Sequence, residues 1–312
     1  MFDTKKILIC GGTGMVGGAI KRALETTRAK LYCPSRKELD LLDQYQVREW
    51  MMTRKPDLVF MAAGKVGGIA ANMNKPAEFI YENNVMAANL VHFSWQAGVE
   101  KLLYFGSSCI YPSDCQQPMT ESMLMTGKLH ESNTPYALAK LSGLTLCQSY
   151  NRQYGTNFIS CLPCNLYGPG DNYAPESSHV PAALIRRFDK AVCTGQKTVT
   201  VWGTGKPRRE FLHVDDLAKA SLHLMKFYRR TEPVNIGTGE DIPIRDFAEK
   251  IAKVTGFQGN IVFDASRPDG IERKCLDISK IKELGWRPEI SLDDGLQQTY
   301  EYYRKYERQN LH

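Results

Sequence analysis

The sequence lacks the features that mark membrane, secreted and disordered proteins. No stretch approaches the roughly 18 consecutive apolar residues of a membrane-spanning helix, although 43% of the 312 residues are hydrophobic. The residues from Met1 to Lys6 lead directly into an apolar segment, without the longer apolar core of a secretory signal peptide. Internal repeats and low-complexity linkers are also missing. We therefore expect a soluble, cytoplasmic protein with one sizeable core and room for a smaller second domain.

The sequence also lacks the cysteine pattern of a disulfide-rich protein and any block of like charge. The nine cysteines are odd in number and scattered from Cys10 to Cys275, so we expect reduced thiols. Forty Lys and Arg residues against 34 Asp and Glu give a net charge of +6, which no single run of like charges concentrates. This pattern argues against nucleic acid as a partner, and we expect neither a membrane nor a metal ion to be bound. A modest positive excess suits a phosphorylated small molecule.

What the sequence does contain is an alternation of apolar runs and amphipathic segments. Continuous apolar runs, typical of strands buried on both faces, are found at 7–10, 31–33, 58–63, 102–105, 158–162 and 234–237. Helical patterns of crossover length lie at about 15–26, 43–53, 75–97 and 136–153, with two more near 243–255 and 292–307. The pattern predicts an α/β fold with a Rossmann-type doubly wound parallel sheet.

Glycine and proline become frequent after Asn165, which indicates a change in organisation. We predict a nucleotide-binding domain of residues 1–166 with about 209–237. A smaller, interleaved α/β substrate domain is predicted from about 167–208 and 238–312, because no linker separates two consecutive domains.

The first predicted strand ends in a glycine motif. Gly11, Gly14 and Gly17 are spaced G-x-x-G-x-x-G between that strand and a helix that Met15 and Val16 open. In this context the glycines permit a tight turn, close approach of a pyrophosphate, and packing of helix on strand. The helix N-terminus adds free N–H groups and a positive dipole end. The motif predicts a dinucleotide site; a generic tight turn is the alternative.

The end of the second predicted strand indicates which dinucleotide is bound. NAD sites usually carry an acidic residue there for the ribose 2′-hydroxyl, whereas this sequence has Ser35 and Arg36. A guanidinium bonds a 2′-phosphate that a carboxylate would repel. We therefore predict NADP(H), with Arg36 as an ordinary solvated cation left as the alternative.

A catalytic group is indicated by Tyr136 and Lys140, which are four residues apart on one predicted helix face after Pro135. An ammonium beside a phenol is expected to lower its pKa. If the chain stays extended after the fourth strand, Ser107 and Cys109 point to the same side. Taken alone, either residue would be assigned to the core. The combination favours a reductase site instead.

These features together resemble the extended short-chain dehydrogenase/reductase family over essentially the whole chain. Within it, the similarity is greatest to the epimerase-reductases of GDP-4-keto-6-deoxy-D-mannose, and it is carried by the phrases at 63–69, 106–112, 149–155, 165–169, 178–180, 201–203, 209–216 and 263–270. Related dehydratases have Thr-Asp-Glu at the strand end, where this chain has Ser107-Ser108-Cys109. The resemblance therefore implies 3,5-epimerisation and NADPH-dependent 4-reduction of a GDP-sugar, in a homodimer paired through helices near 84–97 and 136–153.

The resemblance also implies roles for individual residues. Ser107, Tyr136 and Lys140 correspond to the reductase triad, and Cys109 and His179 to the epimerase acid-base pair. Positions that hold the GDP-sugar are matched by Arg187, Trp202, Arg209, Asp269 and Lys274. Cofactor positions, besides the glycine motif and Arg36, are matched by Leu41, Lys140, Pro163, Asn165, Leu166 and His179. The chain departs from the family pattern at Gly12-Thr13, often His-Arg, and at Cys164 and Gly170, usually Thr and His.

These residue types suit the implied chemistry. The C3 and C5 hydrogens of a 4-keto sugar are both α to a carbonyl, so a base removes either one when hydroxyl donors stabilise the enolate oxygen. Three alternatives stay open: a histidine at position 179 that only caps the following helix, a 4-reductase or 4-epimerase on another nucleotide-diphosphate sugar such as a dideoxy or heptose substrate, and an NADP-binding sensor without turnover.

Overall fold

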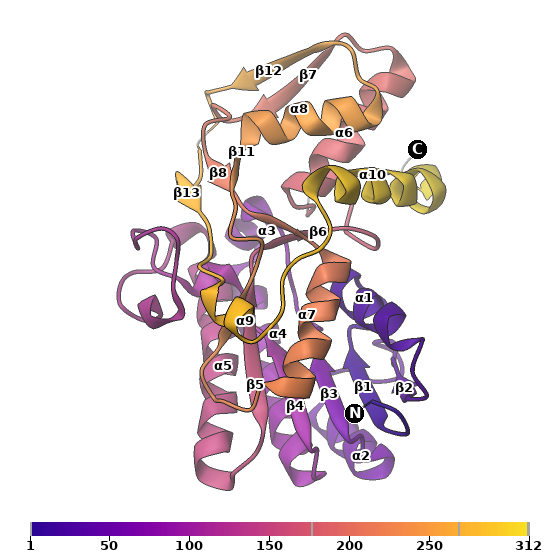
Figure 1. The fold of residues 1–312 in the computed structure, drawn as a ribbon, viewed down its shortest axis with the longest axis vertical. Helices are drawn as coiled ribbons and strands as arrows, with labels where there is room; N and C mark the ends of the chain where they lie inside the picture. The colour runs from indigo at the N-terminus through magenta and orange to yellow at the C-terminus, as the bar shows by residue number, and fades with distance from the viewer. Residues whose placement is uncertain (1, 176, 268, 311–312) are drawn as a thin grey trace.

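A six-stranded parallel sheet forms the centre of the computed structural model, which describes residues 2–175, 177–267 and 269–310 (Figure 1). Pro268, within one phrase of the family resemblance, lies outside the described residues. The sheet consists of β1 (Lys6–Cys10), β2 (Lys30–Tyr32), β3 (Leu58–Met61), β4 (Lys101–Phe105), β5 (Phe158–Pro163) and β10 (Val234–Ile236), in the order β10-β5-β4-β3-β1-β2. Every predicted strand is present, and the predicted fold class is confirmed.

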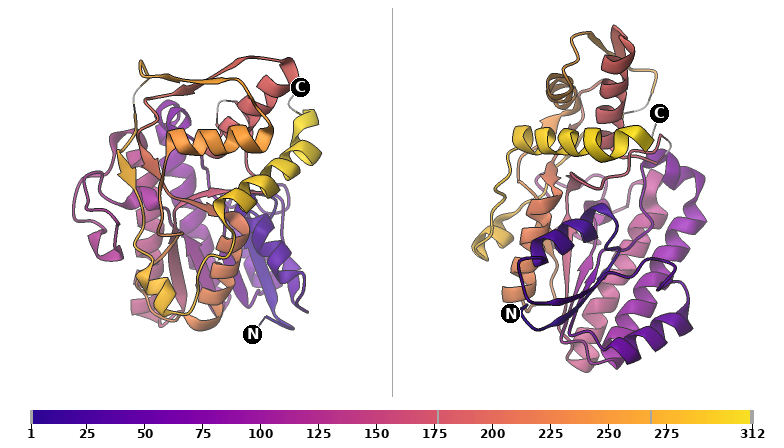
Figure 2. Two further views of the ribbon diagram at one scale, coloured as in Figure 1. Left: turned by 45° about the horizontal axis from the view of Figure 1, so that its top comes forward. Right: turned by 90° about the vertical axis from the view of Figure 1, so that its right-hand side faces the viewer.

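Helices cover both faces of this sheet, as the two views of Figure 2 show. One layer contains α1 (Met15–Leu24) and α7 (Val214–Phe227), which pack against each other. The other layer contains α2 (Gln44–Arg54), α4 (Pro76–Gln96) and α5 (Thr134–Tyr154). A short helix, α3 (Ile69–Asn74), precedes α4. Because both faces are covered, β3, β4 and β5 are buried along their whole length. Helix α7 was not predicted from the hydrophobic pattern, and its segment has four charged residues.

The order of the strands fixes where a ligand binds. From β1 the chain first adds β2 on one side and then returns to add β3 on the other, so the direction of winding changes between β1 and β3. In open parallel sheets the crevice at such a point, beyond the carboxyl ends of the strands, holds the ligand. The glycine motif follows β1 directly and therefore lies at this crevice.

The rest of the chain builds a smaller region at the same end of the sheet, in the upper part of Figure 1. Its elements are β6 (Asn165–Tyr167), α6 (Val180–Thr194), β7 (Thr198–Trp202), β8 (Arg208–Arg209), β9 (Phe211–His213), β11 (Ile242–Pro243), α8 (Ile244–Thr255), β12 (Asn260–Asp264), β13 (Arg273–Lys274) and α10 (Leu292–Tyr302). Three small sheets join them: β12 with β7, β6 with β9, and β11-β8-β13. Between β13 and α10 the chain returns to the central sheet, where α9 (Ser279–Glu283) packs beside β10. Short helical turns complete the chain at Ser108–Ile110, Glu121–Met123, Glu131–Asn133, Tyr303–Glu307 and Arg308–Asn310.

Two separate hydrophobic clusters underlie this arrangement. The larger lies around the six-stranded sheet, and it includes residues of α7 and β10 together with Ile281 and Trp286 from the C-terminal part. The smaller is made by aromatic and aliphatic residues of α6, β7, α8 and α10, among them Phe188, Phe247 and Tyr300. The chain thus crosses between the two clusters more than once. The predicted domain boundaries at 166, 209 and 237 stay a prediction.

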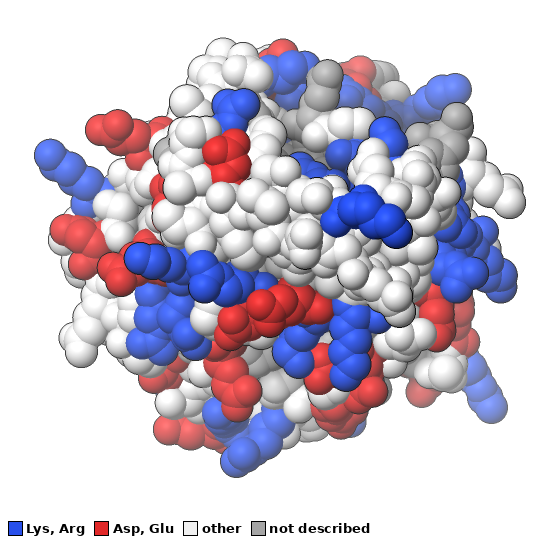
Figure 3. Space-filling view, turned by 90° about the horizontal axis from the view of Figure 1, so that it is seen from above, with Lys and Arg blue, Asp and Glu red and all other residues white. Residues whose placement is uncertain are grey.

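Charge and hydropathy are distributed without large blocks. No helix among the described residues combines the length and apolarity that crossing a bilayer requires. Acidic and basic side chains are interspersed over the face seen in Figure 3. That face carries the smaller region, above the carboxyl ends of the central strands.

Candidate functional site

The glycine turn after β1 approaches the end of β3 closely. Gly11 has a φ of +81°, and a Cβ there would come within 2.8 Å of the Ala63 backbone nitrogen. A Cβ at Gly17 would lie 2.2 Å from the Gly11 oxygen. Gly14 occupies the N-cap of α1 without a side-chain cap, so the first-turn N–H groups of Met15 and Val16 face outward from the helix end. Backbone donors and a positive dipole end converge here, as an anion requires.

The end of β2 differs from the expectation in one respect. Arg36 is largely exposed, with its Nε 3.6 Å from an Asp40 oxygen, and Ser35 donates from both N and Oγ to Glu38 at 2.8 Å. Two carboxylates therefore lie beside the residues predicted to bind a 2′-phosphate, although neither stands at the strand end itself. Leu41 is buried nearby, and its carbonyl accepts from Asn89.

The segment after β4 turns instead of staying extended. Ser107 is the N-cap of a short helical turn at 108–110, and its Oγ accepts a hydrogen bond from the Cys109 backbone N–H at 3.2 Å. The assumption of an extended chain was therefore wrong, because this turn interrupts the strand geometry. Ser107 and Cys109 are nevertheless brought together, while the neighbouring Ser108 is buried.

Tyr136 and Lys140 lie in the first two turns of α5, which Pro135 opens and Gly155 ends in a left-handed conformation. Lys140 is buried, its Nζ donates to the Phe105 carbonyl at 2.9 Å, and the same Nζ is 5.9 Å from the centre of the Tyr136 ring. Burial lowers the pKa of Lys140 to about 8.

The expected lowering of the Tyr136 pKa is not found. Burial raises the pKa of its phenol, the neighbouring Cys109 raises it further, and a hydrogen bond with Ser107 acts in the opposite direction. The phenol is therefore protonated at neutral pH, the state from which it donates a proton.

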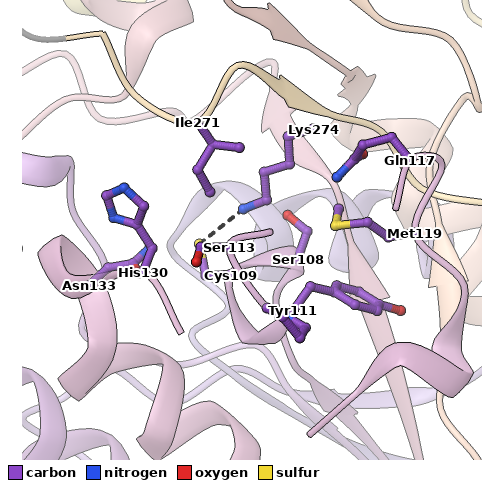
Figure 4. Close-up of a pocket in the computed structure, with 11 residues that line it drawn as sticks. Ser108, Cys109, Tyr111, Ser113, Gln117, Met119, His130, Asn133, Ile271 and Lys274 are labelled. Carbon is purple, nitrogen blue, oxygen red and sulfur yellow. Dashed lines mark hydrogen bonds between the residues drawn. The ribbon is translucent and has the colours of Figure 1, made fainter. Parts of the chain in front are cut away.

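Cys109 borders a pocket, shown in Figure 4, that contains two side chains with titratable nitrogens. Lys274 Nζ lies 3.5 Å from Cys109 Sγ, and His130 stands on the opposite side of the thiol from Gln117. Nδ1 of His130 is engaged with Ser132 Oγ at 2.8 Å. His130 was not predicted from the sequence, because it belongs to no motif and its position shortly before the Tyr136 helix is its only signal.

His179 is the N-cap residue of α6, but its side chain makes no cap hydrogen bond, so the alternative of a purely capping histidine is not supported. Desolvation lowers the pKa of its imidazole. The preceding residues Ser177 and Ser178 contact the loop at Gly67 and Gly68. Among the hydrogen bonds of the described residues, none joins His179 to Cys109.

The predicted GDP-sugar residues form two groups. In one, Trp202 is exposed and faces two guanidinium groups, with Arg187 Cζ 5.8 Å and Arg267 Cζ 5.1 Å from its ring. The carboxylate of Asp269 accepts hydrogen bonds from the Thr204 backbone N–H at 2.9 Å and from the Thr204 hydroxyl at 2.6 Å. These bonds hold the turn after Trp202. In the other, Arg209 and Lys274 are paired across β8 and β13. Arg267 belongs to the phrase at 263–270 that carries the resemblance, but it was not predicted as a site residue, since a lone loop arginine has no distinctive spacing.

The predicted cofactor residues at the end of β5 continue the same crevice. Pro163 ends that strand opposite Ile236, while Asn165 and Leu166 belong to β6, where the Asn165 amide donates to the Glu210 carbonyl at 2.8 Å. Between them, Cys164 is buried, and its thiol pKa is raised well above its usual value, chiefly by burial. The charges of the neighbouring Glu210 and Cys275 raise the pKa of this thiol further.

Known proteins resemble this chain both in sequence and in fold. A family model described as the NAD dependent epimerase/dehydratase family matches residues 7–237. GDP-L-fucose synthase of Escherichia coli (strain K12) is 49% identical over 309 residues, covering 96% of this chain and 96% of the relative. A solved GDP-6-OMe-4-keto-L-xylo-heptose reductase from C. jejuni gives a TM-score of 0.93 at 36% identity, over 97% of this chain and 99% of that one. A GDP-L-fucose synthetase from Naegleria fowleri bound to NADP gives 0.91 at 29%, over 98% and 95%.

Proposed function

The chain belongs to the NAD dependent epimerase/dehydratase family, and we propose that it catalyses NADPH-dependent 3,5-epimerisation and 4-reduction of GDP-4-keto-6-deoxy-D-mannose to GDP-L-fucose. The observation that carries the proposal is the position of Ser107, which interacts with Cys109 and with Tyr136. A reductase needs only the hydroxyls and the lysine. A thiol beside the same serine adds the proton transfer that an epimerisation requires.

The described residues fit NADP(H). The glycine turn leaves no side chain between the crevice and the N-terminus of α1, which suits a pyrophosphate. The Arg36–Asp40 pair is long and exposed, so the guanidinium readily exchanges this partner for a 2′-phosphate. Lys140 lies beside Gly64, whose Cβ position is 3.4 Å from its Nζ, which supports a role for Lys140 in holding the nicotinamide ribose. When bound, the cofactor supplies the hydride for C4.

The protein's own groups account for the remaining steps. Cys109 and His179 move protons at C3 and C5, while Ser107 and Tyr136 stabilise the negative charge that develops on the C4 oxygen. Tyr136, kept protonated by burial, then donates its proton to that oxygen during reduction. Arg209 and Lys274 supply positive charge next to Cys109, and Trp202 with Arg187 offers a surface for the nucleotide.

A 4-reductase acting on a GDP-heptose is the second candidate, because the heptose reductase from C. jejuni matches the fold at a TM-score of 0.93. The deciding experiment is NADPH oxidation with GDP-4-keto-6-deoxy-D-mannose, followed by NMR of the product. GDP-L-fucose supports the proposal. A 6-deoxy product of unchanged configuration at C3 and C5, or turnover only with a keto-heptose, overturns it.

We also propose that the protein works as a cytoplasmic homodimer, paired through the outer faces of α4 and α5. The outer face of α5 carries Leu138, Ser142, Thr145 and Ser149, all exposed. The hydroxyls of Thr145 and Ser149 bond carbonyls of their own helix, at 2.9 and 2.8 Å, so a partner helix can cover them without leaving unsatisfied donors.

A further inference from the structure

At the proposed epimerase site, the ammonium group of Lys274 contacts the thiol of Cys109 directly. Lys274 Nζ lies 3.5 Å from Cys109 Sγ, as the dashed line in Figure 4 marks. The Cys109 backbone N–H donates a hydrogen bond to Ser107 Oγ, which holds in place the backbone that carries the thiol.

The small β11-β8-β13 sheet determines where Lys274 points. Arg273 is paired with Arg208, and Lys274 with Arg209. Side chains alternate between the two faces of a strand. Arg208 and Arg273 both form ion pairs with the buried carboxylate of Asp241 on one face, the Arg273 contact measuring 2.6 Å. Arg209 and Lys274 consequently share the other face, toward Cys109.

We propose that Lys274 is a positioning residue that holds Cys109 as a thiolate, the form in which it acts as the base of epimerisation. This inference rests on the proposed function and deepens it, since the resemblance assigns Lys274 only to substrate binding. In the step, the thiolate takes a proton from C3 or C5, the C–H electron pair forms the carbon–carbon double bond, and the carbonyl electrons move to the C4 oxygen. The thiol formed is beside an ammonium that favours its renewed ionisation.

Some groups around Cys109 raise the pKa of its thiol and others lower it. Burial raises the pKa of the thiol, but Lys274, the hydrogen bond with Ser107 and the charge of Arg209 outweigh it, so the pKa lies below its usual value. Tyr136 from α5 faces the thiol in its neutral form, and His130 lines the same pocket. Lys274 provides the largest favourable contribution and the only direct ammonium contact among these groups.

The test measures alkylation of Cys109 by iodoacetamide in the full-length protein without substrate, between pH 5 and 10. Peptide fragmentation separates Cys109 from Cys115, and the exposed Cys193 serves as an internal reference. Thiolate is the reactive form. In Lys274→Met we expect the midpoint for Cys109 to rise by at least about one pH unit, so that alkylation at pH values below both midpoints is about tenfold slower than in the wild type. Lys274→Arg should retain most of the wild-type midpoint, and Lys253→Met, an exposed change on α8, should retain all of it.

A midpoint that Lys274→Met leaves unchanged, with only KM for the keto sugar raised, overturns the proposal and leaves Lys274 as a substrate ligand. If Lys274→Met does not fold, the Lys274→Arg and Lys274→Gln variants decide in the same way. Because alkylation needs no turnover, failure of the proposed function is seen separately, as an absence of GDP-L-fucose with wild-type protein whose Cys109 still shows the lowered midpoint.

Discussion

At the scale of single residues, burial is the strongest influence on the proposed catalytic groups. It keeps Tyr136 protonated and lowers the pKa of Lys140 to about 8, so the two side chains do not form the phenolate-ammonium pair that their spacing suggests. Cys109 is the exception, since Lys274, the hydrogen bond with Ser107 and the charge of Arg209 together outweigh its burial and lower its pKa. The site thus separates a proton donor from a base, although the two side chains lie on either side of one serine.

This separation predicts that the two reactions respond to different substitutions. In deuterium oxide, with only oxidised cofactor present, wild-type protein should exchange the C3 and C5 hydrogens of the keto sugar, as NMR would show. Tyr136→Phe should keep measurable exchange, because Ser107 still stabilises the enolate, but lose about a hundredfold or more in reduction. Cys109→Ala should abolish most exchange while still binding NADPH. Undiminished exchange in both Cys109→Ala and His179→Ala would mean that the protein is a simple reductase.

Cofactor choice is predicted to depend on Arg36. Replacing it by Asp places a third carboxylate beside Glu38 and Asp40, and repels a 2′-phosphate but not a 2′-hydroxyl. Arg36→Asp should therefore raise the Kd for NADPH far more than that for NADH, measured by fluorescence titration. Lys37→Asp, the same charge change at the exposed neighbouring position, is the matched control. Equal losses for both cofactors would refute the assignment.

At the scale of elements, the sequence predicts regular structure well and turns poorly. The strands of the central sheet were predicted because they are continuously apolar, and the glycine turn because its spacing is specific. The short helical turn after Ser107 and the carboxylates beside Arg36 were not predicted, since both depend on local hydrogen bonds that periodicity does not report. The contact between Lys274 and Cys109 joins positions 165 residues apart, so it required the tertiary structure.

Two neighbouring glycines of α1 should respond to alanine in opposite ways. A Cβ at Gly17 would lie 2.2 Å from the Gly11 backbone oxygen, so Gly17→Ala must displace the turn that the cofactor needs. At Gly18 the nearest atom to a Cβ is a flexible Arg22 nitrogen at 3.7 Å, within the helix. Gly18→Ala should raise the free energy of unfolding by roughly 0.5–1 kcal/mol and leave NADPH affinity unchanged. Denaturant melts and cofactor titrations check both, and comparable affinity in the two variants would contradict the assigned turn.

At the scale of the whole molecule, Glu210 connects segments that are distant in sequence. Its buried carboxyl accepts from the backbone N–H groups of Gly239, at 2.7 Å, and Leu276, at 2.8 Å, and so ties the strand region at 208–213 to two later loops. Burial raises its pKa from 4.5 to about 7. Between these values the folded protein binds more protons than the unfolded chain, so this group's contribution to stability falls as pH rises.

Glu210→Gln should lower the free energy of unfolding by about 1–3 kcal/mol, because an amide NH2 group faces one of the two N–H donors. The stability difference between wild type and this variant should be larger at pH 5 than at pH 8, since only the wild type carries the titrating carboxyl. Denaturant unfolding at both pH values measures it, with the exposed Glu249→Gln as control. A difference that is larger at pH 8 would show that the carboxylate is the stabilised form.

If the proposed dimer is paired through α5, a charged substitution on that helix should dissociate it, whereas a matched substitution on α6 should not. Leu138 on α5 is 43% exposed and Val192 on α6 is 40% exposed, so a glutamate costs each side chain a similar amount in the isolated subunit. In a dimer paired through α4 and α5, only the glutamate at position 138 is buried against the second copy, which costs the desolvation of its charge. Leu138→Glu should therefore shift the mass measured by light scattering from two subunits toward one, or make it depend on concentration, whereas Val192→Glu should remain dimeric. A wild-type protein with the mass of one subunit, or equal dissociation of both variants, would rule out pairing through these helices.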